Sequence, residues 1–374
     1  MIVQKQGWRQ LDWVLLGTVL LICIAGIFAI RSALHLDLHP LDLVRKQIFG
    51  VVLGLSIAVA LAHSDYEVLV KRYARYLYPL NIFLLLVVLS HFGGHAAKGA
   101  SRWIKLGPVE VQPSEFAKLI LITTLALFLA QHEQTITEWR TLLKSLVHIG
   151  VPMLLIAKQP DLGTALVLLA IWFGMTLIAG AKPLHLLAVL LAGVALFAVL
   201  WQFNPGHVLK DYQKNRLQVF LNPSADPRDT GYHLRQSEIA IGSGGIGGEG
   251  YEKGAQSNGK FIPEQHTDFI FTIIGEEGGF IVCLALLSLY LVLLERGVAV
   301  MAECRDPLGR LLAAGVLSML TFHVVVNVGM TMGIMPVVGV PLPFFSYGLS
   351  SLLVNLSAVG LLLSVAARRH RVMF

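Results

Sequence analysis

Long apolar runs follow one another along most of the chain, separated by short polar segments. Residues 13–30 contain no charged side chain, and about 20 apolar residues are enough for a helix to cross the hydrocarbon layer of a bilayer. A backbone in lipid must satisfy its own hydrogen bonds, so such runs predict transmembrane helices. The pattern predicts ten spans, at 13–31, 46–63, 76–92, 113–131, 145–158, 161–180, 183–203, 268–294, 309–333 and 346–367.

An even number of spans places both ends of the chain on one side of the membrane. If that side is the cytoplasm, its short segments carry more lysine and arginine than the short segments opposite, as expected for cytoplasmic loops. The long segment 204–267, between the seventh and eighth spans, then lies outside the cytoplasm. Aromatic and aliphatic residues are interspersed among its glycines and polar residues, which predicts an ordered loop with short helices.

Composition agrees with this pattern. Hydrophobic residues make up 55% of the chain and charged residues only 14%, with a mean hydropathy of +0.70, whereas soluble domains carry about 25% charged residues. The chain is therefore predicted to be an all-α polytopic membrane protein, one transmembrane domain over residues 1–374 with the large loop 204–267 within it. The first run is longer than the apolar part of a secretory signal, so we expect it to remain as a helix.

A glycine motif in the long loop invites a different interpretation. Gly242, Gly244 and Gly247 satisfy G-x-G-x-x-G, but that fingerprint binds dinucleotides only between a strand and a helix of a βαβ unit. No such unit is predicted around it. We expect these glycines to provide tight turns, or to let the loop backbone approach a neighbouring segment closely.

Charged residues gather where the fourth span begins. Pro113 suits the first turn of a helix, and Glu115 and Lys118 follow it at i, i+3 spacing on one helix face. The pair forms a salt bridge, or Lys118 joins Arg102 and Lys105 in an anion site near the outer surface, helped by the positive end of the helix dipole. Trp103, between those two cations, is a substrate contact or an interface anchor.

Two aspartates stand where later spans begin. Asp161 follows Pro160 and either caps its helix or belongs to the outward-facing site, to which Lys158 adds positive charge. Asp268, in "HTDF", is either a helix cap or a general base that removes a proton from a substrate hydroxyl. His266 is a candidate hydrogen-bond partner of Asp268.

Six segments, in order along essentially the whole chain, resemble the SEDS proteins (shape, elongation, division and sporulation), and 336–343 resembles the elongation branch more than the division branch. Leu349 departs from the family pattern, which commonly has a second glycine after "SYG". The segments are "KGASRWIKLG", "QPSEFAKL", "QPDLGTA", "GYHLRQSEIAIGSGGIGGEG", "PEQHTDFIF" and "GIMPVVGVPLPFFSYG".

This resemblance implies a peptidoglycan glycosyltransferase that polymerises lipid II at the outer face of the bacterial cytoplasmic (inner) membrane, for cell-wall elongation and rod shape. It implies that Asp268 is the essential carboxylate. A class B penicillin-binding protein, a single-pass transpeptidase, is the implied partner, with other elongation-complex proteins and membrane lipids around it and no nucleic acid. No obligatory cofactor is implied, although a divalent cation such as Mg²⁺ is a candidate for neutralising the lipid diphosphate.

Two other functions remain open on the sequence. A flippase for a lipid-linked precursor would also need many helices and cations, but a transporter places its charged site near the bilayer midplane between repeated halves. This chain has no evident internal repeat, and its charges gather at one face. A non-catalytic scaffold for the transpeptidase would tolerate the replacement of Asp268.

Overall fold

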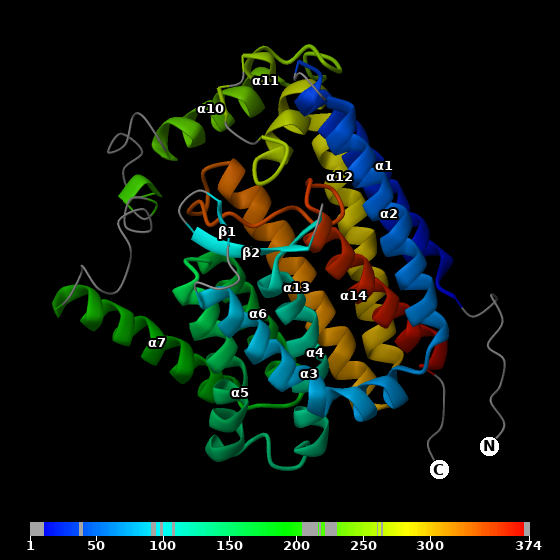
Figure 1. Cartoon of the computed structure of the whole chain (residues 1–374), viewed down its shortest axis with the longest axis vertical. Helices are drawn as coiled ribbons and strands as arrows, with labels where there is room; N and C mark the ends of the chain where they lie inside the picture. The colour runs from blue at the N-terminus through cyan, green and yellow to red at the C-terminus, as the bar shows by residue number, and fades with distance from the viewer. Residues whose placement is uncertain are drawn as a thin grey trace.

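The computed structural model contains the ten long helices that the hydropathy pattern predicts (Figure 1). Eight of the described helices are long and apolar enough to cross a membrane, while the apolar stretches Leu162–Ile178 of α6 and Pro183–Leu196 of α7 are shorter. The structure describes residues 11–36, 40–90, 95–97, 100–106, 109–203, 216, 218–220, 230–259, 261–262 and 265–369. The long helices are α1 (Trp13–Leu34), α2 (Pro40–His63), α3 (Tyr66–Leu89), α4 (Pro113–Gln131), α5 (Trp139–Lys158), α6 (Leu162–Ile178), α7 (Pro183–Phe203), α12 (Ile270–Glu303), α13 (Pro307–Thr331) and α14 (Leu349–Arg368).

Several helices extend beyond the apolar runs that predict them. The predicted starts at 46, 76 and 145 are wrong, because α2, α3 and α5 begin several residues earlier, and the predicted end at 294 is wrong because α12 continues to Glu303. At α3, Asp65 caps the helix and accepts a hydrogen bond from the Glu67 amide at 3.0 Å. Charged residues mark where a helix leaves the hydrocarbon, and a capped helix can continue past that boundary.

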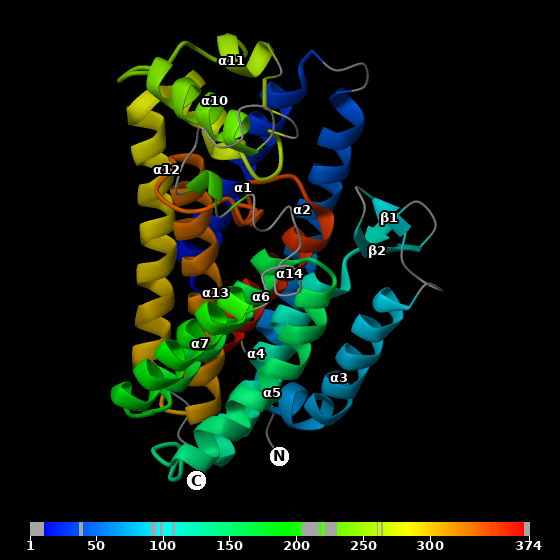
Figure 2. The ribbon, with the colours of Figure 1, turned by 90° about the vertical axis from the view of Figure 1, so that its left-hand side faces the viewer.

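Helices α4, α13 and α14 form the centre of the bundle, where most residues of each span are buried. Helix α13 packs against α4, α6 and α12, α14 lies along α2, and α1 lies against α12. In Figures 1 and 2, α7 projects from the bundle, and its packing is mainly against α6. The Leu184 and Val194 side chains of α7 are largely exposed, as for a helix that faces lipid.

One end of the bundle joins the first helix to the last ones. Asp12, which caps α1, pairs with Arg296 of α12 at 2.6 Å, and Arg369 at the end of α14 pairs with Glu303 at 2.9 Å. The start of α1 and the ends of α12 and α14 therefore lie together. This agrees with an even number of spans.

The opposite end carries the elements that are not membrane helices. An antiparallel sheet of β1 (His95–Ala97), β2 (Ala100–Leu106) and β3 (Val109–Val111) precedes α4. The hydropathy pattern did not predict it, because strands this short leave no long alternation. The connection from α7 to α12 contains the short helices α10 (Thr230–Ser243) and α11 (Ala255–Asn258), as expected for an ordered loop.

The segment between α13 and α14 is packed inside the bundle. Phe344 and Phe345 are buried, and a Cβ added to Gly26 of α1 would overlap the Phe345 backbone. The buried Tyr290 hydroxyl of α12 donates a hydrogen bond to the Pro343 carbonyl at 2.6 Å. Helices from both ends of the chain thus hold this segment in place.

Candidate active site

A cavity of about 150 Å³ lies where the sheet, the start of α6, the start of α12 and the end of α13 meet. Two carboxylates and two guanidinium groups contribute to its wall. The described residues that line it are Arg102, Pro160, Asp161, Leu162, Leu166, Arg216, Asp268, Pro336, Val337, Val338 and Gly339.

Asp268 reaches this cavity from just ahead of α12. That helix begins at Ile270 with Phe269 at the N-cap position, so Asp268 stands one residue ahead of the cap. The Asn327 side chain of α13 donates hydrogen bonds to the backbone carbonyls of Asp268 at 2.8 Å and of Val340 at 2.7 Å. One buried amide therefore fixes the backbone that carries the carboxylate to the segment that forms the opposite wall.

Gly339 leaves room for the carboxylate. Its φ of +73° is a backbone conformation that favours glycine. A Cβ built there would lie 3.1 Å from Asp268 Oδ2 and 3.7 Å from Arg216 Nη1. The Asp268 carboxylate and the Arg216 guanidinium group therefore converge over this glycine.

Sequence reasoning did not select Arg216. The residue lies in "NRLQVFLNP", one of several charged positions in a loop whose path the hydropathy pattern does not determine. The regular apolar spacing of that segment could have marked it as an ordered part of the loop. It could not have shown which cation faces Asp268.

Arg102 lines the cavity and also connects β2 to a neighbouring turn. Its Nε donates to the Gln159 carbonyl at 3.0 Å, and its Nη2 donates to the Pro160 carbonyl. These bonds join β2 to the turn between α5 and α6. Backbone carbonyls thus hold the guanidinium group of this cavity-lining residue in place.

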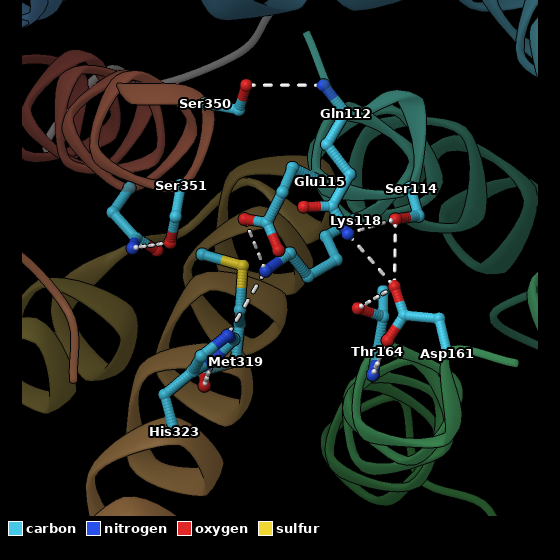
Figure 3. Close-up of polar contacts among 11 residues, drawn as sticks. Gln112, Ser114, Glu115, Lys118, Asp161, Thr164, Met319, His323, Ser350 and Ser351 are labelled. Atoms are coloured by element: carbon cyan, nitrogen blue, oxygen red, sulfur yellow. Dashed lines mark hydrogen bonds and ion pairs between the residues drawn. The ribbon is translucent and has the colours of Figure 1, made fainter. Parts of the chain in front are cut away.

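Asp161 is the cap of α6, as one of its two interpretations predicted. It accepts from the Thr164 amide at 3.2 Å through Oδ1 and from the Thr164 hydroxyl at 3.0 Å through Oδ2. The same Oδ2 accepts from Ser114 at 3.0 Å and from Gln112 at 3.1 Å (Figure 3). The carboxylate is 5% exposed, so its main contacts hold the starts of α4 and α6 together.

Glu115 and Lys118 form the predicted salt bridge, and a histidine completes the cluster (Figure 3). Lys118 Nζ lies 2.8 Å from Glu115 Oε2 and 3.1 Å from His323 Nε2, and His323 Nδ1 lies 2.7 Å from the Met319 carbonyl. A carbonyl only accepts, so a neutral His323 holds its proton on Nδ1 and offers Nε2 to the ammonium group.

This cluster is closed to solvent. Lys118 and His323 are each 1% exposed and Glu115 is 5% exposed, and neither Glu115 nor Lys118 is among the described residues that line the cavity. An ammonium group in this position neutralises a buried carboxylate. Direct anion binding by Lys118 stays a prediction, and it would require the pair to separate.

The sequence is similar to proteins of known family over nearly its whole length. The sequence matches the FtsW/RodA/SpoVE model, described as a cell cycle protein, over residues 10–371. The chain belongs to the FtsW/RodA/SpoVE family. It is 39% identical to the peptidoglycan glycosyltransferase MrdB of Escherichia coli strain K12, over 98% of this chain and 96% of that protein. It is 35% identical to the peptidoglycan glycosyltransferase RodA of Treponema pallidum, over 97% of this chain and 99% of the relative.

Solved structures of this family share the fold. A chain from a peptidoglycan synthase complex, described for the coordination of polymerization and crosslinking, matches with a TM-score of 0.82 at 35% identity, over 97% of this chain and all of that one. The rod shape-determining protein RodA of Thermus thermophilus matches with a TM-score of 0.72 at 33% identity, over 97% and 99%. The predicted all-α polytopic fold and the SEDS resemblance are confirmed.

The other predicted site residues of this FtsW/RodA/SpoVE protein, Trp103, Lys105 and His266, are not among the described residues that line the cavity. Trp103 is partly exposed on β2, where its backbone pairs with His95. Lys105 is on the same strand, and its side chain lies outside the described residues. The His266 carbonyl accepts from the Tyr347 amide at 3.0 Å, and their ring centroids are 5.6 Å apart. The expected hydrogen bond between His266 and Asp268 stays a prediction.

A divalent cation has limited protein ligands at this site. Among the described residues, no group of three or more His, Cys, Asp or Glu side chains could hold a metal ion. Asp161 already accepts four hydrogen bonds. Mg²⁺ commonly binds through one or two carboxylates together with substrate phosphates, so the residues fit such an ion only if Asp268 and a bound diphosphate share it.

Proposed function

We propose that this protein polymerises lipid II into glycan strands for cell-wall elongation, with Asp268 as the general base. The observation that carries the proposal is the meeting of the Asp268 carboxylate with Arg216 and Arg102 in one cavity. The full-length similarity to peptidoglycan glycosyltransferases supports the reaction class. The SEDS resemblance supports lipid II as the substrate and the elongation branch as the setting.

The reaction requires a base at the attacking hydroxyl and positive charge at the leaving diphosphate. A sugar 4-hydroxyl attacks the anomeric carbon of a second lipid-linked disaccharide, forming the new glycosidic bond. The hydroxyl proton passes to Asp268, and the bond between the anomeric carbon and the lipid diphosphate breaks. Because the diphosphate leaves as a stable anion, it needs cations more than it needs an acid.

Arg216 and Arg102 are placed to provide that charge. Both guanidinium groups line the cavity that contains Asp268, and guanidinium groups suit bidentate contact with phosphate oxygens. A divalent ion shared by Asp268 and the diphosphate would add further neutralisation when bound. Since the site offers one activating carboxylate and the mechanism has no covalent intermediate, we expect inversion at the anomeric carbon, by analogy with hydrolases.

The partner and the orientation belong to the same proposal. The complex described for coordinated polymerization and crosslinking supports a partnership with a class B penicillin-binding protein. We place the protein in the bacterial cytoplasmic membrane with both termini inside, and the cavity and the loop 204–267 outside. Residues 1–374 then act as one transmembrane domain.

The decisive test uses purified protein in detergent, where no membrane remains to be crossed. With the transpeptidase and Mg²⁺ present, we expect lipid II to be converted into glycan chains and Asp268→Asn to abolish the conversion. A flippase would form no polymer in this assay. Persistent absence of polymer, together with transfer of lipid II between the leaflets of reconstituted vesicles, would replace the proposal with the transporter.

A further inference from the structure

Helix α12 is broken at Gly279, in its first third. The residue has φ 63° and ψ −166° in an otherwise helical segment. In a continuous helix the amides of Phe280 and Ile281 would donate to the carbonyls of Glu276 and Glu277. The break separates an outer segment, 270–278, from the long inner part of α12.

The glycine-rich loop 244–250 bonds to four backbone groups on the two sides of the break. The Phe280 and Ile281 amides donate to the carbonyls of Gly245 at 2.9 Å and Ile246 at 3.2 Å. In return, the Glu249 and Gly250 amides donate to the carbonyls of Glu276 and Glu277, each at 3.0 Å. A break in a membrane helix is tolerated where neighbouring segments replace its lost bonds.

The loop must approach α12 closely to make these bonds, and two of its glycines permit this. A Cβ on Gly244 would overlap the Gly275 carbonyl, and a Cβ on Gly248, whose φ is +76°, would overlap the Glu277 carbonyl. Gly242 and Gly247 have nothing within 4 Å of an added Cβ. The motif that resembles a dinucleotide fingerprint therefore contains one glycine required by close packing and two that are not.

The side chains of the outer segment also contact elements other than the inner part of α12. The Glu276 carboxylate, which is fully buried, accepts from the amides of Gln256 at 2.5 Å and Ser257 at 3.0 Å, both in α11. The Glu277 carboxylate accepts from the Ser32 hydroxyl of α1 at 2.6 and 2.7 Å. Segment 270–278 is thus bound to the loop, to α11 and to α1, and Asp268 lies two residues before it.

We infer that the loop 244–250 is a positioning element for the glycosyl transfer, because it fixes the direction in which the outer segment of α12 presents Asp268 to the cavity. This inference rests on the proposed role of Asp268. Gly244, Gly248 and Gly279 act through backbone geometry and do not touch the reacting atoms. A displacement of about 1 Å in a reacting group can cost about 10²-fold in rate.

The test compares Gly244→Ala and Gly248→Ala with Gly242→Ala and Gly247→Ala in the full chain bound to its transpeptidase. The first two variants should lower kcat by about 10²-fold with little change in KM, and their Phe280 and Ile281 amides should lose protection from hydrogen exchange. The two control variants should stay within about twofold of the parent, because their added methyl groups meet nothing. Equal kcat values across all four variants would overturn the inference, as would lost amide protection with unchanged kcat.

A gentler change covers the case in which Gly248→Ala does not fold. Ser32→Ala removes the bond between α1 and Glu277 and leaves the loop contacts intact, so if the loop positions the outer segment kcat should stay within about twofold of the parent. A large loss of kcat in Ser32→Ala, with parental protection of the Phe280 and Ile281 amides, would mean that α1 and not the loop positions Asp268. If Asp268→Asn polymerises at the parental rate, the proposed base is wrong, whereas the exchange of the Phe280 and Ile281 amides still reports whether the loop holds the break.

Discussion

The Asn327 side-chain amide donates a hydrogen bond to the backbone carbonyl of Asp268, 59 positions away in the chain, at 2.8 Å. Asn327 is fully buried in α13, and its second hydrogen bond, to Val340, reaches the segment that contains Gly339. The carboxylate and the glycine beneath it are therefore placed by one side chain. Both sides of the cavity should respond together when that side chain is changed.

Asp268→Asn isolates the chemistry from the fold. The amide has nearly the shape of the carboxylate but cannot take a proton, and a missing general base typically costs 10²–10⁴-fold in rate. Since Asp268 does not occupy the N-cap of α12, stability should be little changed. The measurement is the initial polymerisation rate at matched amounts of intact complex. Near-parental rates would mean that another residue is the base.

Asn327→Ala tests the placement of that base. The change leaves the part-buried Asp268 carbonyl and the buried Val340 carbonyl without this donor, at a cost of up to about 1–3 kcal/mol each, and should lower both the thermal transition and kcat. Asn355→Ala is the matched control, because Asn355 is equally buried but bonds to Ser351 within its own helix. If the two variants lose activity in the same proportion to their loss of stability, Asn327 has no special role in the site.

Gly339→Ala should reduce activity beyond its effect on folding. A non-glycine residue at positive φ costs about 1 kcal/mol or somewhat more, and the new methyl group would crowd Asp268 Oδ2 and displace it. Gly333→Ala carries the same backbone penalty at φ +72° but meets only the exposed side chain of Glu238. We therefore expect similar melting temperatures and a lower polymerisation rate for Gly339→Ala alone. Equal rates would show that the space over Gly339 is not needed.

Lys118→Met should destabilise the protein strongly. It leaves the Glu115 carboxylate buried without its partner, which typically costs about 3–5 kcal/mol, and Lys118→Met with Glu115→Gln should recover most of that loss. Thermal unfolding in detergent measures both variants. A single variant as stable as the parent would contradict the structural role. A double variant that folds normally but forms no glycan would instead support the predicted anion role of Lys118.

Helix number and order follow from the hydropathy pattern because lipid leaves a spanning backbone few alternatives. The ends were less predictable, since charged residues can lie within a helix after it leaves the hydrocarbon, as Arg296 does. The break at Gly279 was missed for a related reason. The loop 244–250, which replaces the lost backbone hydrogen bonds, is distant in the sequence, and the uncharged run after Gly279 looks the same as that of an unbroken helix.

The site was predicted in part. Asp268 stood out because a carboxylate next to an apolar run is unusual, and Arg102 because its neighbours are cationic. That these two residues and Arg216 line one cavity depends on tertiary structure, which the local sequence does not determine. Lys118 and Glu115 could be paired from their spacing. Their burial beside His323 depends on the packing of α4 against α13.

The segment that contains Pro343 and Phe345 has a consequence for biosynthesis. It contacts Gly26 in the first helix and Tyr290 in α12. The cavity wall that this segment continues therefore forms only after nearly the whole chain has been translated, when the first helix is already in the bilayer. A nascent chain that stalls after α12 would carry Asp268 with no opposing wall. We expect such a chain to insert yet make no glycan, which keeps unfinished copies from consuming precursor at the membrane.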